Sequence, residues 1–157
     1  MNDNKWKSLI SGTDIRGVAL GESITLTSET AAKISYGFIV WLAARQHKNI
    51  AELKVSVGMD CRISGPALKN AVISSILASG CSVLDCGMAT TPAMFFSTYY
   101  DETACDGAIM ITASHLPPDR NGLKFFTSEG GLDQQELVDI LDTISDSEPA
   151  RKVAGSI

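Results

Sequence analysis

The sequence predicts an α/β fold, a three-layer α/β/α sandwich around a mixed, mostly parallel sheet. Short β-branched segments alternate with segments of helical period, turn residues separate them, and the 157 residues have the size of one domain. Hydrophobic residues make up 45% of the chain and charged residues 20%, a composition typical of globular and not of disordered proteins. We expect one domain at 1–146 and a polar linker or tail at 147–157.

The first elements are a long helix, a strand and a second helix. A helix is predicted from Ser28 to about Gln46, because its apolar residues lie on one side of a 3.6-residue period: Ile34, Phe38, Trp41 and Leu42. The β-branched segment Leu53–Asp60 predicts a strand. Pro66–Ser79 then predicts a helix, which Ser64 can cap at its N-terminus.

The alternation continues into the second half of the chain. Cys81–Gly87 predicts a strand, Thr91 and the proline after it open a helix, and Gly107–Thr112 predicts the next strand. Strands that alternate with helices form a parallel sheet through right-handed crossovers. The sequence RNG at Arg120–Gly122 favours a tight reversal, so that Leu123–Phe126 returns as an antiparallel strand and makes the sheet mixed.

A last helix is predicted to begin near Asp133. Asp133 and Glu136 have the spacing of a capping box, and Leu132 with Leu137 has the spacing of a hydrophobic staple. From Asp146 onward the chain is polar, which is typical of a linker or tail.

Composition argues against several classes of function. The formal net charge of −5 and the lack of a Lys/Arg run disfavour a nucleic-acid-binding face. The cysteines at 61, 81, 86 and 105 form no Cys-x-x-Cys pair and have no histidines at zinc-finger spacing, so we expect reduced, mostly buried thiols and no metal framework.

No targeting segment is recognisable. The N-terminus lacks an apolar stretch of signal-peptide length, and the longest apolar run, Tyr36–Ala44, is far shorter than the roughly 20 residues that span a bilayer. We therefore expect a cytoplasmic protein without membrane partners.

Three loops leave the carboxyl ends of the predicted strands, where open α/β sheets bind ligands. These loops are Asp60–Gly65, Gly87–Pro92 and Thr112–Gly122. The side chains expected on this rim are Asp60, Arg62, Ser64, Thr90, Thr91, Ser114 and His115.

The residue types at this rim favour phosphoryl transfer over acyl transfer. We expect that His115, as the direct neighbour of Ser114, cannot easily serve as its base, and no Gly-x-Ser-x-Gly elbow surrounds the serine. Phosphoryl transfer needs a nucleophilic oxygen, which Ser114 offers, and cations, which Arg16, Lys124 and Arg62 offer. More simply, Arg62 can pair with the nearby aspartate to shape its loop.

Four motifs in order resemble the landmarks of the α-D-phosphohexomutase superfamily, which includes phosphoglucomutase, phosphomannomutase and phosphoglucosamine mutase. They are GTDIRG at 12–17, VGMDCRISG at 57–65, TASH at 112–115 and GLKF at 122–125. The resemblance covers nearly the whole chain, but only the first domain of such enzymes.

The resemblance implies a role for each matching residue. Ser114 matches the serine that is phosphorylated in the resting enzyme and exchanges its phosphoryl group with a sugar phosphate. Arg16 matches the arginine that steadies the phosphoserine, His115 and Lys124 match residues that handle protons and contact the phosphate, and a phosphoserine oxygen ligates Mg²⁺. Residues expected to support phosphate binding are Asp60, Arg62 and Thr13.

Two departures from the family pattern limit what the resemblance implies. Leu116 and Pro117 follow the histidine where the family's commonest loop has Asn-Pro, which leaves the subfamily open. The family's Asp-x-Asp-x-Asp magnesium loop, sugar-recognition loop and distal phosphate loop belong to later domains, and no such aspartate triplet occurs here.

We therefore expect partners in a hexose phosphate and in the later domains, and no activity from the chain alone. The choice among glucose, mannose and glucosamine phosphates stays open. The alternative is a non-catalytic phosphate-binding or protein-interaction module.

Overall fold

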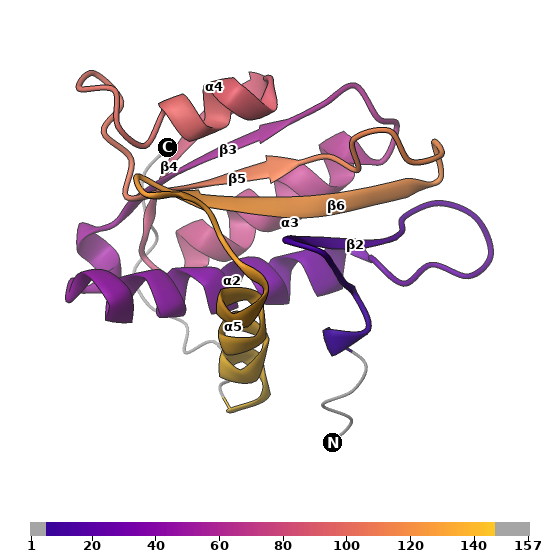
Figure 1. Cartoon of the computed structure of the whole chain (residues 1–157), viewed down its shortest axis with the longest axis horizontal. Helices are drawn as coiled ribbons and strands as arrows, with labels where there is room; N and C mark the ends of the chain where they lie inside the picture. Colours follow the sequence, from indigo (N-terminus) through magenta and orange to yellow (C-terminus); the bar gives the residue numbers. More distant parts are fainter. Residues whose placement is uncertain (1–5, 147–157) are drawn as a thin grey trace.

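The computed structural model describes residues 6–146, which form a seven-stranded sheet in the order β1-β2-β6-β5-β3-β4, with β7 beside β6 (Figure 1). The strands are β1 (Ile10–Ser11), β2 (Asp14–Val18), β3 (Lys54–Met59), β4 (Ser82–Met88), β5 (Gly107–Ile111), β6 (Arg120–Thr127) and β7 (Gly130–Gly131). The helices described are α2 (Ser28–Gln46), the 3₁₀ helix η1 (Ile50–Glu52), α3 (Gly65–Ala78), α4 (Thr91–Phe96) and α5 (Gln134–Asp146). The expected tail at 147–157 lies outside the described residues.

The predicted α/β sandwich with a mixed sheet is confirmed, but the sheet is not mostly parallel, because two strand pairs are parallel and four, including β6–β7, are antiparallel. β3 pairs in parallel with β4 and with β5. The pairs β5–β6, β2–β6 and β1–β2 are antiparallel. The loop between β5 and β6 contains no helix, and strands joined without a crossover run antiparallel.

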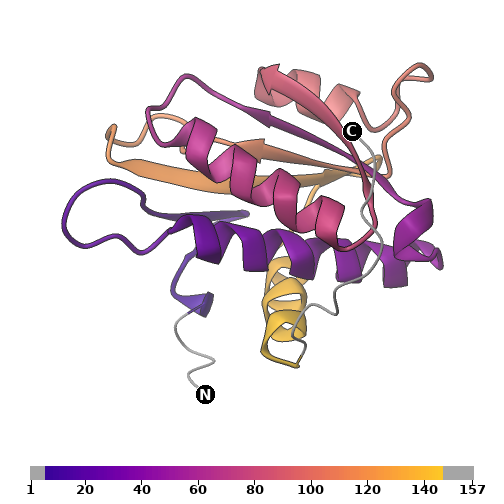
Figure 2. The ribbon, with the colours of Figure 1, turned by 180° about the vertical axis from the view of Figure 1, so that it is seen from behind.

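Helices cover the two faces of the sheet unequally. α2 and α3 lie on one face and the short α4 on the other, while α5 packs against α2 (Figures 1 and 2). The larger core lies under α2 and α3, where the rings of Phe38 and Phe125 are 4.8 Å apart. Under α4 a smaller cluster contains Met94, Met110 and Phe126. The α4 face therefore leaves more of the sheet open for polar side chains.

Helix α2 has the predicted span and buries the predicted face. Ile34, Phe38 and Leu42 are fully buried, whereas Trp41 is partly buried and packs against the edge of the core. The helix begins after Thr27, whose side chain accepts a hydrogen bond from the backbone N–H of Thr30.

The predicted starts of α4 and α5 are also confirmed. The hydroxyl of Thr90 accepts a hydrogen bond from the N–H of Ala93, so α4 begins at Thr91. At α5 the N–H of Glu136 donates to the Asp133 carboxylate at 2.8 Å, and the N–H of Asp133 donates to the Glu136 carboxylate at 2.9 Å. These two reciprocal bonds are the predicted capping box.

The predicted cap of α3 is wrong. Ser64 makes no side-chain bond to the helix N-terminus, and its buried hydroxyl accepts a hydrogen bond from the Asn121 amide at 2.8 Å. Asn121 is itself fully buried, so its amide needs an internal partner. Ser64 therefore ties α3 to β6.

The predicted reversal at Arg120–Gly122 is wrong as well, because all three residues lie in β6. The chain turns earlier, between β5 and Arg120. A Cβ on Gly122 would meet the carbonyl oxygens of Ile15 and, at 2.8 Å, Thr112, so this glycine allows three neighbouring segments to approach closely. In this case the glycine indicates backbone contact and not a turn.

Strand β2 was not predicted. No strand was expected at GTDIRG, yet Asp14–Val18 is an inner strand paired with β1 and β6. Among the described helices, none is long and apolar enough to span a bilayer.

Candidate active site

Ser114 lies in the loop that joins β5 to β6, residues 112–119; this loop together with Arg120, the first residue of β6, is here called the serine loop. It is exposed, and its backbone has a left-handed φ of 55°, which only a small share of non-glycine residues adopt. Its N–H donates to the hydroxyl of Thr112 at 3.0 Å, and that hydroxyl donates to the Asp60 carboxylate at 2.7 Å. The loop after β5 is thus tied to the loop after β3, as expected of two parallel neighbours.

Ser114 and His115 contact each other, contrary to expectation. The Ser114 hydroxyl lies 3.2 Å from Nδ1 of His115. Among the hydrogen bonds of residues 6–146, no carboxylate is bonded to the His115 ring, so the third member of a hydrolase triad is not supplied there. The pair can exchange a proton without forming that triad.

Asp60 and Arg62 form the ion pair considered from the sequence, with 3.2 Å between Nε and the carboxylate. The rest of the Arg62 guanidinium reaches across to backbone carbonyl groups of the serine loop. The side chain is only 10% exposed.

A second group of charges, here called the Asp14 cluster, lies on β2 and β6. The Asp14 carboxylate binds Arg16 Nη2 at 2.7 Å and Lys124 Nζ at 2.8 Å, and Lys124 Nζ is also 3.4 Å from the Thr13 hydroxyl. The alternation of a strand explains the arrangement. Ile15 and Leu123 point into the larger core, so their charged neighbours point to the α4 face.

Arg16 differs from the other charges of this cluster in one respect. Its Nε is buried and makes no hydrogen bond, the only such side-chain nitrogen or oxygen found in residues 6–146. A buried donor without a partner costs about 1–3 kcal/mol, and a ligand oxygen can remove that cost.

The two groups of charges meet at Gly122. Its carbonyl accepts a hydrogen bond from the N–H of Thr112, and it pairs with Arg16 in the sheet. Within residues 6–146, no hydrogen bond or ion pair joins Ser114 to Arg16 or to Lys124. The protein brings the predicted residues to neighbouring strands without closing them into one network.

Thr90 and Thr91 do not join this site, because their segment opens α4. Ser64 joins it only through its bond to Asn121. Asp14 was missed as a site residue, although its spacing of two from Arg16 would have placed both on one face of a strand had a strand been expected.

The described residues do not supply a metal centre by themselves, because residues 6–146 contain no group of three or more His, Cys, Asp or Glu side chains placed to hold an ion. The four cysteines are free thiols, with Cys81 and Cys105 buried and Cys61 exposed. Burial raises the pKa of Cys81 to about 12, so this thiol stays protonated at neutral pH.

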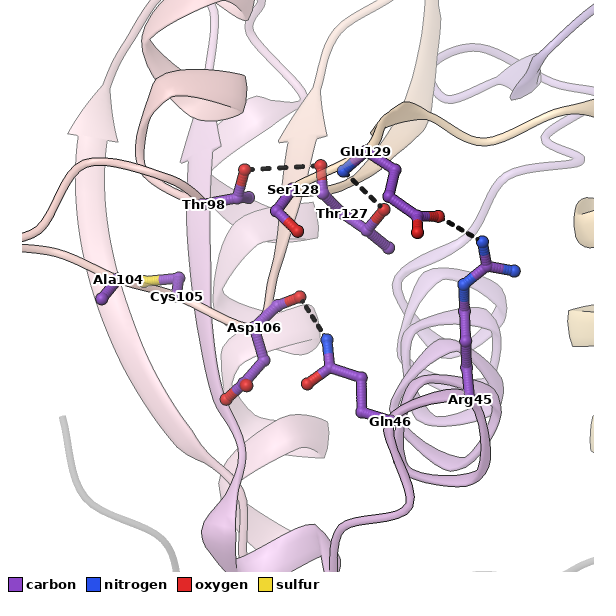
Figure 3. Close-up of a pocket in the computed structure, with 9 residues that line it drawn as sticks. All are labelled: Arg45, Gln46, Thr98, Ala104, Cys105, Asp106, Thr127, Ser128 and Glu129. Atoms are coloured by element: carbon purple, nitrogen blue, oxygen red, sulfur yellow. Dashed lines mark hydrogen bonds and ion pairs between the residues drawn. The ribbon is translucent and has the colours of Figure 1, made fainter.

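A cavity of about 350 Å³ lies at the other end of β5, before Gly107 (Figure 3). Its polar groups bind one another: Arg45 pairs with Glu129, and Gln46 donates to the carbonyl of Asp106. None of the predicted site residues lines it.

Comparisons with known proteins identify the family and agree with the fold. A family model described as phosphoglucomutase/phosphomannomutase, alpha/beta/alpha domain I, matches residues 8–151. A phosphoglucosamine mutase of Clostridium kluyveri is 39% identical over 137 residues, which are 87% of this chain and 28% of that protein. A phosphoglucomutase/phosphomannomutase of Thermococcus kodakarensis is 40% identical over 116 residues, 74% of this chain and 24% of that protein.

A crystal structure of a phosphoglucomutase/phosphomannomutase family protein from Burkholderia thailandensis superposes with a TM-score of 0.79 at 30% identity. The match covers 96% of this chain and 32% of that one. The chain thus spans about a quarter to a third of the length of these relatives.

Proposed function

Since this chain belongs to the phosphoglucomutase/phosphomannomutase family, as an α/β/α domain I, we propose that Ser114 is the phosphoryl donor and acceptor of a hexose-phosphate mutase. One observation carries the proposal. Ser114 is exposed in a left-handed turn at the carboxyl end of β5, and the neighbouring strands β2 and β6 carry two cations, of which Arg16 has a buried, unpaired donor.

The proposed reaction has two transfers. In one, the Ser114 phosphate passes to a hydroxyl of the sugar monophosphate: the hydroxyl loses its proton, an O–P bond to the sugar forms, the bond to Ser114 Oγ breaks, and Oγ takes up a proton. In the other, Oγ attacks the phosphorus at the opposite end of the sugar bisphosphate, loses its proton, and the sugar oxygen takes one up. The sum moves a phosphoryl group between O1 and O6.

Each residue of the site has a role in this scheme. His115 Nδ1, 3.2 Å from the hydroxyl, can take and return the Ser114 proton. Arg16 and Lys124 neutralise the equatorial phosphoryl oxygens, whose charge is otherwise the main obstacle to transfer. Thr13 contacts Lys124 and supports its placement.

Magnesium enters the proposal only through the phosphorylated serine. Hard cations bind oxygen ligands and usually draw on several carboxylates, which the described residues do not bring together. We therefore assign one phosphoserine oxygen as this chain's ligand and derive no step through the ion.

We place the other residues that bind the sugar in the part of the relatives' length that this chain does not cover. We propose that a hexose phosphate binds between this domain and later domains, and that the 157 residues alone do not turn it over. We further propose a cytoplasmic location. The sequence of the gene beyond the codon for Ile157 tests whether later domains are encoded.

The test of the function is Ser114→Ala in the full product of the gene, with Ser128→Ala as a control because Ser128 is also an exposed loop serine. We expect loss of hexose-phosphate mutase turnover in the first variant and normal turnover in the second. The free energy of unfolding should change little, since a loop hydroxyl contributes little stability. Normal turnover by Ser114→Ala would contradict the mechanism and favour a non-catalytic module.

A further inference from the structure

We propose that Arg62 is a positioning residue that sets the shape of the serine loop, and that it does not bind the phosphoryl group. The inference rests on the proposed function of Ser114 and deepens it. It differs from the expectation at the sequence level, which placed Arg62 among the residues that support phosphate binding.

The donors of Arg62 are fully used. A guanidinium has five N–H donors in a fixed plane. Nε binds Asp60, and each of the two terminal nitrogens binds two carbonyl oxygens. Those carbonyls and their distances are Ser114 at 2.9 Å, Leu116 at 2.9 Å, Pro117 at 2.8 Å and Arg120 at 3.0 Å. No donor is left for a phosphate oxygen unless the loop is released.

The serine loop has few internal hydrogen bonds to hold its shape. Pro117 and Pro118 have no N–H, and two backbone–backbone bonds lie within the loop, from Leu116 to Ala113 and from Arg120 to Pro117, beside the bond from the Ser114 N–H to the Thr112 hydroxyl. From outside, the N–H groups of Ala19 and Leu20 bind only the carbonyl of Asp119. The planar guanidinium of Arg62 donates hydrogen bonds to carbonyl groups from both ends of the loop. One of them belongs to Ser114, whose left-handed backbone is costly for a residue with a Cβ.

The position of Arg62 is itself fixed by Asp60. Its backbone N–H and its Nε both bind Asp60, and Asp60 also accepts the Thr112 hydroxyl that supports the N–H of Ser114. The nucleophile is therefore held on its N–H side through Thr112 and on its carbonyl side through Arg62. Both supports end at Asp60.

Lysine cannot replace this arrangement. An ammonium offers three donors around one point, whereas four carbonyls are here arranged around a plane. If Arg62 acted only as a positive charge near the phosphate, lysine would retain most of the function. The difference between the two substitutions is thus the measurable sign of a positioning role.

The experiment compares Arg62→Lys and Arg62→Gln in the full product of the gene, with Arg45→Gln as the control. Arg45 is also an arginine bound to carboxylates, but it lies at the opposite end of the sheet. Amide hydrogen exchange is measured at Leu116 and Arg120, whose N–H groups bond within the loop, and kcat and KM are measured with the hexose phosphate.

We expect exchange at the two loop amides to rise about tenfold or more in both Arg62 variants, while amides of β5 stay unchanged. We expect kcat to fall about a hundredfold with little change in KM, since a nucleophile displaced by about 1 Å loses that much. Arg62→Lys should restore neither the slow exchange of the loop amides nor kcat. Arg45→Gln should change neither quantity.

Two results would overturn the proposal. One is loop exchange that is unchanged in both variants. The other is a raised KM with a normal kcat in Arg62→Gln, together with near-normal kcat and KM in Arg62→Lys. That result would make Arg62 a phosphate ligand. If Arg62→Gln does not fold, Arg62→Lys alone decides. The exchange readout needs no catalysis, so it separates failure of the clamp from failure of Ser114 as the nucleophile.

Discussion

Arg16 and Arg62 lie on the same rim of the sheet, yet the protein uses their guanidinium groups differently. Arg62 directs every donor at this protein's own oxygens, four of them backbone carbonyls. Arg16 binds one carboxylate, shares it with Lys124, and keeps its Nε buried and unpaired. One arginine is satisfied without a ligand and the other is not.

The difference shows that charge alone does not identify a phosphate ligand. Both arginines follow an aspartate by two residues, and both were expected near phosphate from the sequence. A count of occupied donors separates them, because a group whose donors all have partners loses as much as it gains by binding an anion. On this ground we propose Arg16 as the phosphate ligand and Arg62 as the support of the loop.

The largest effect should come from Arg16→Gln, which keeps hydrogen-bonding capacity but removes the charge. We expect phosphoryl transfer to slow about a hundredfold, the usual cost of losing one preorganised stabilising group. Single-turnover transfer from a hexose bisphosphate to Ser114 measures it. Unlike in the Arg62 variants, exchange of the loop amides should stay normal. A transfer rate within about twofold of wild type would remove Arg16 from the site.

A smaller effect is expected from Asp14→Asn, which should lower the stability of the protein and increase its stabilisation by phosphate. Loss of the carboxylate leaves Arg16 and Lys124 without their counter-ion, so stability should fall by about 1–2 kcal/mol, less than for a fully buried pair. The same loss frees both cations for an anion. Inorganic phosphate should therefore raise the melting temperature of this variant more than that of wild type.

Thermal unfolding in chloride and in phosphate at matched ionic strength measures this response. Asp101→Asn is the control, because Asp101 is an exposed aspartate in the turn after α4. An equal phosphate response in Asp14→Asn and wild type would show that Asp14 does not compete with an anion for the two cations.

The smallest effect concerns the backbone at Ser114. Glycine has no Cβ penalty at a φ of 55°, so Ser114→Gly should be more stable than Ser114→Ala by about 1 kcal/mol. Urea unfolding of the two variants measures the difference, and neither should transfer phosphate. Equal stability would mean that the loop relaxes to another conformation when serine is absent, and that its left-handed turn is not imposed.

Sequence reasoning was most successful where the signal was local. The span of α2 follows from its apolar period, and the capping box at Asp133 follows from residue spacing alone. The grouping of Asp60 with the serine loop followed from one rule, that parallel neighbours end at the same edge.

What could not be predicted depends on contacts distant in sequence. Gly122 looked like a turn residue, but it is a glycine because two strands, β2 and β6, and the loop after β5 approach closely there. Asp14 was not expected in a strand, because nothing in GTDIRG shows that β6 will pair beside it. The carbonyls bound by Arg62 lie 52 to 58 residues away, and backbone groups leave no trace in side-chain patterns.

The most direct test of Ser114 as the phosphoryl carrier is to locate the phosphate. The full product of the gene is incubated with a hexose 1,6-bisphosphate and digested, and its peptides are mapped by mass spectrometry. A single phosphoryl group on Ser114, lost again when sugar monophosphate is added, is the predicted result. A phosphoryl group on another residue, or turnover without any phosphorylated serine, would contradict it.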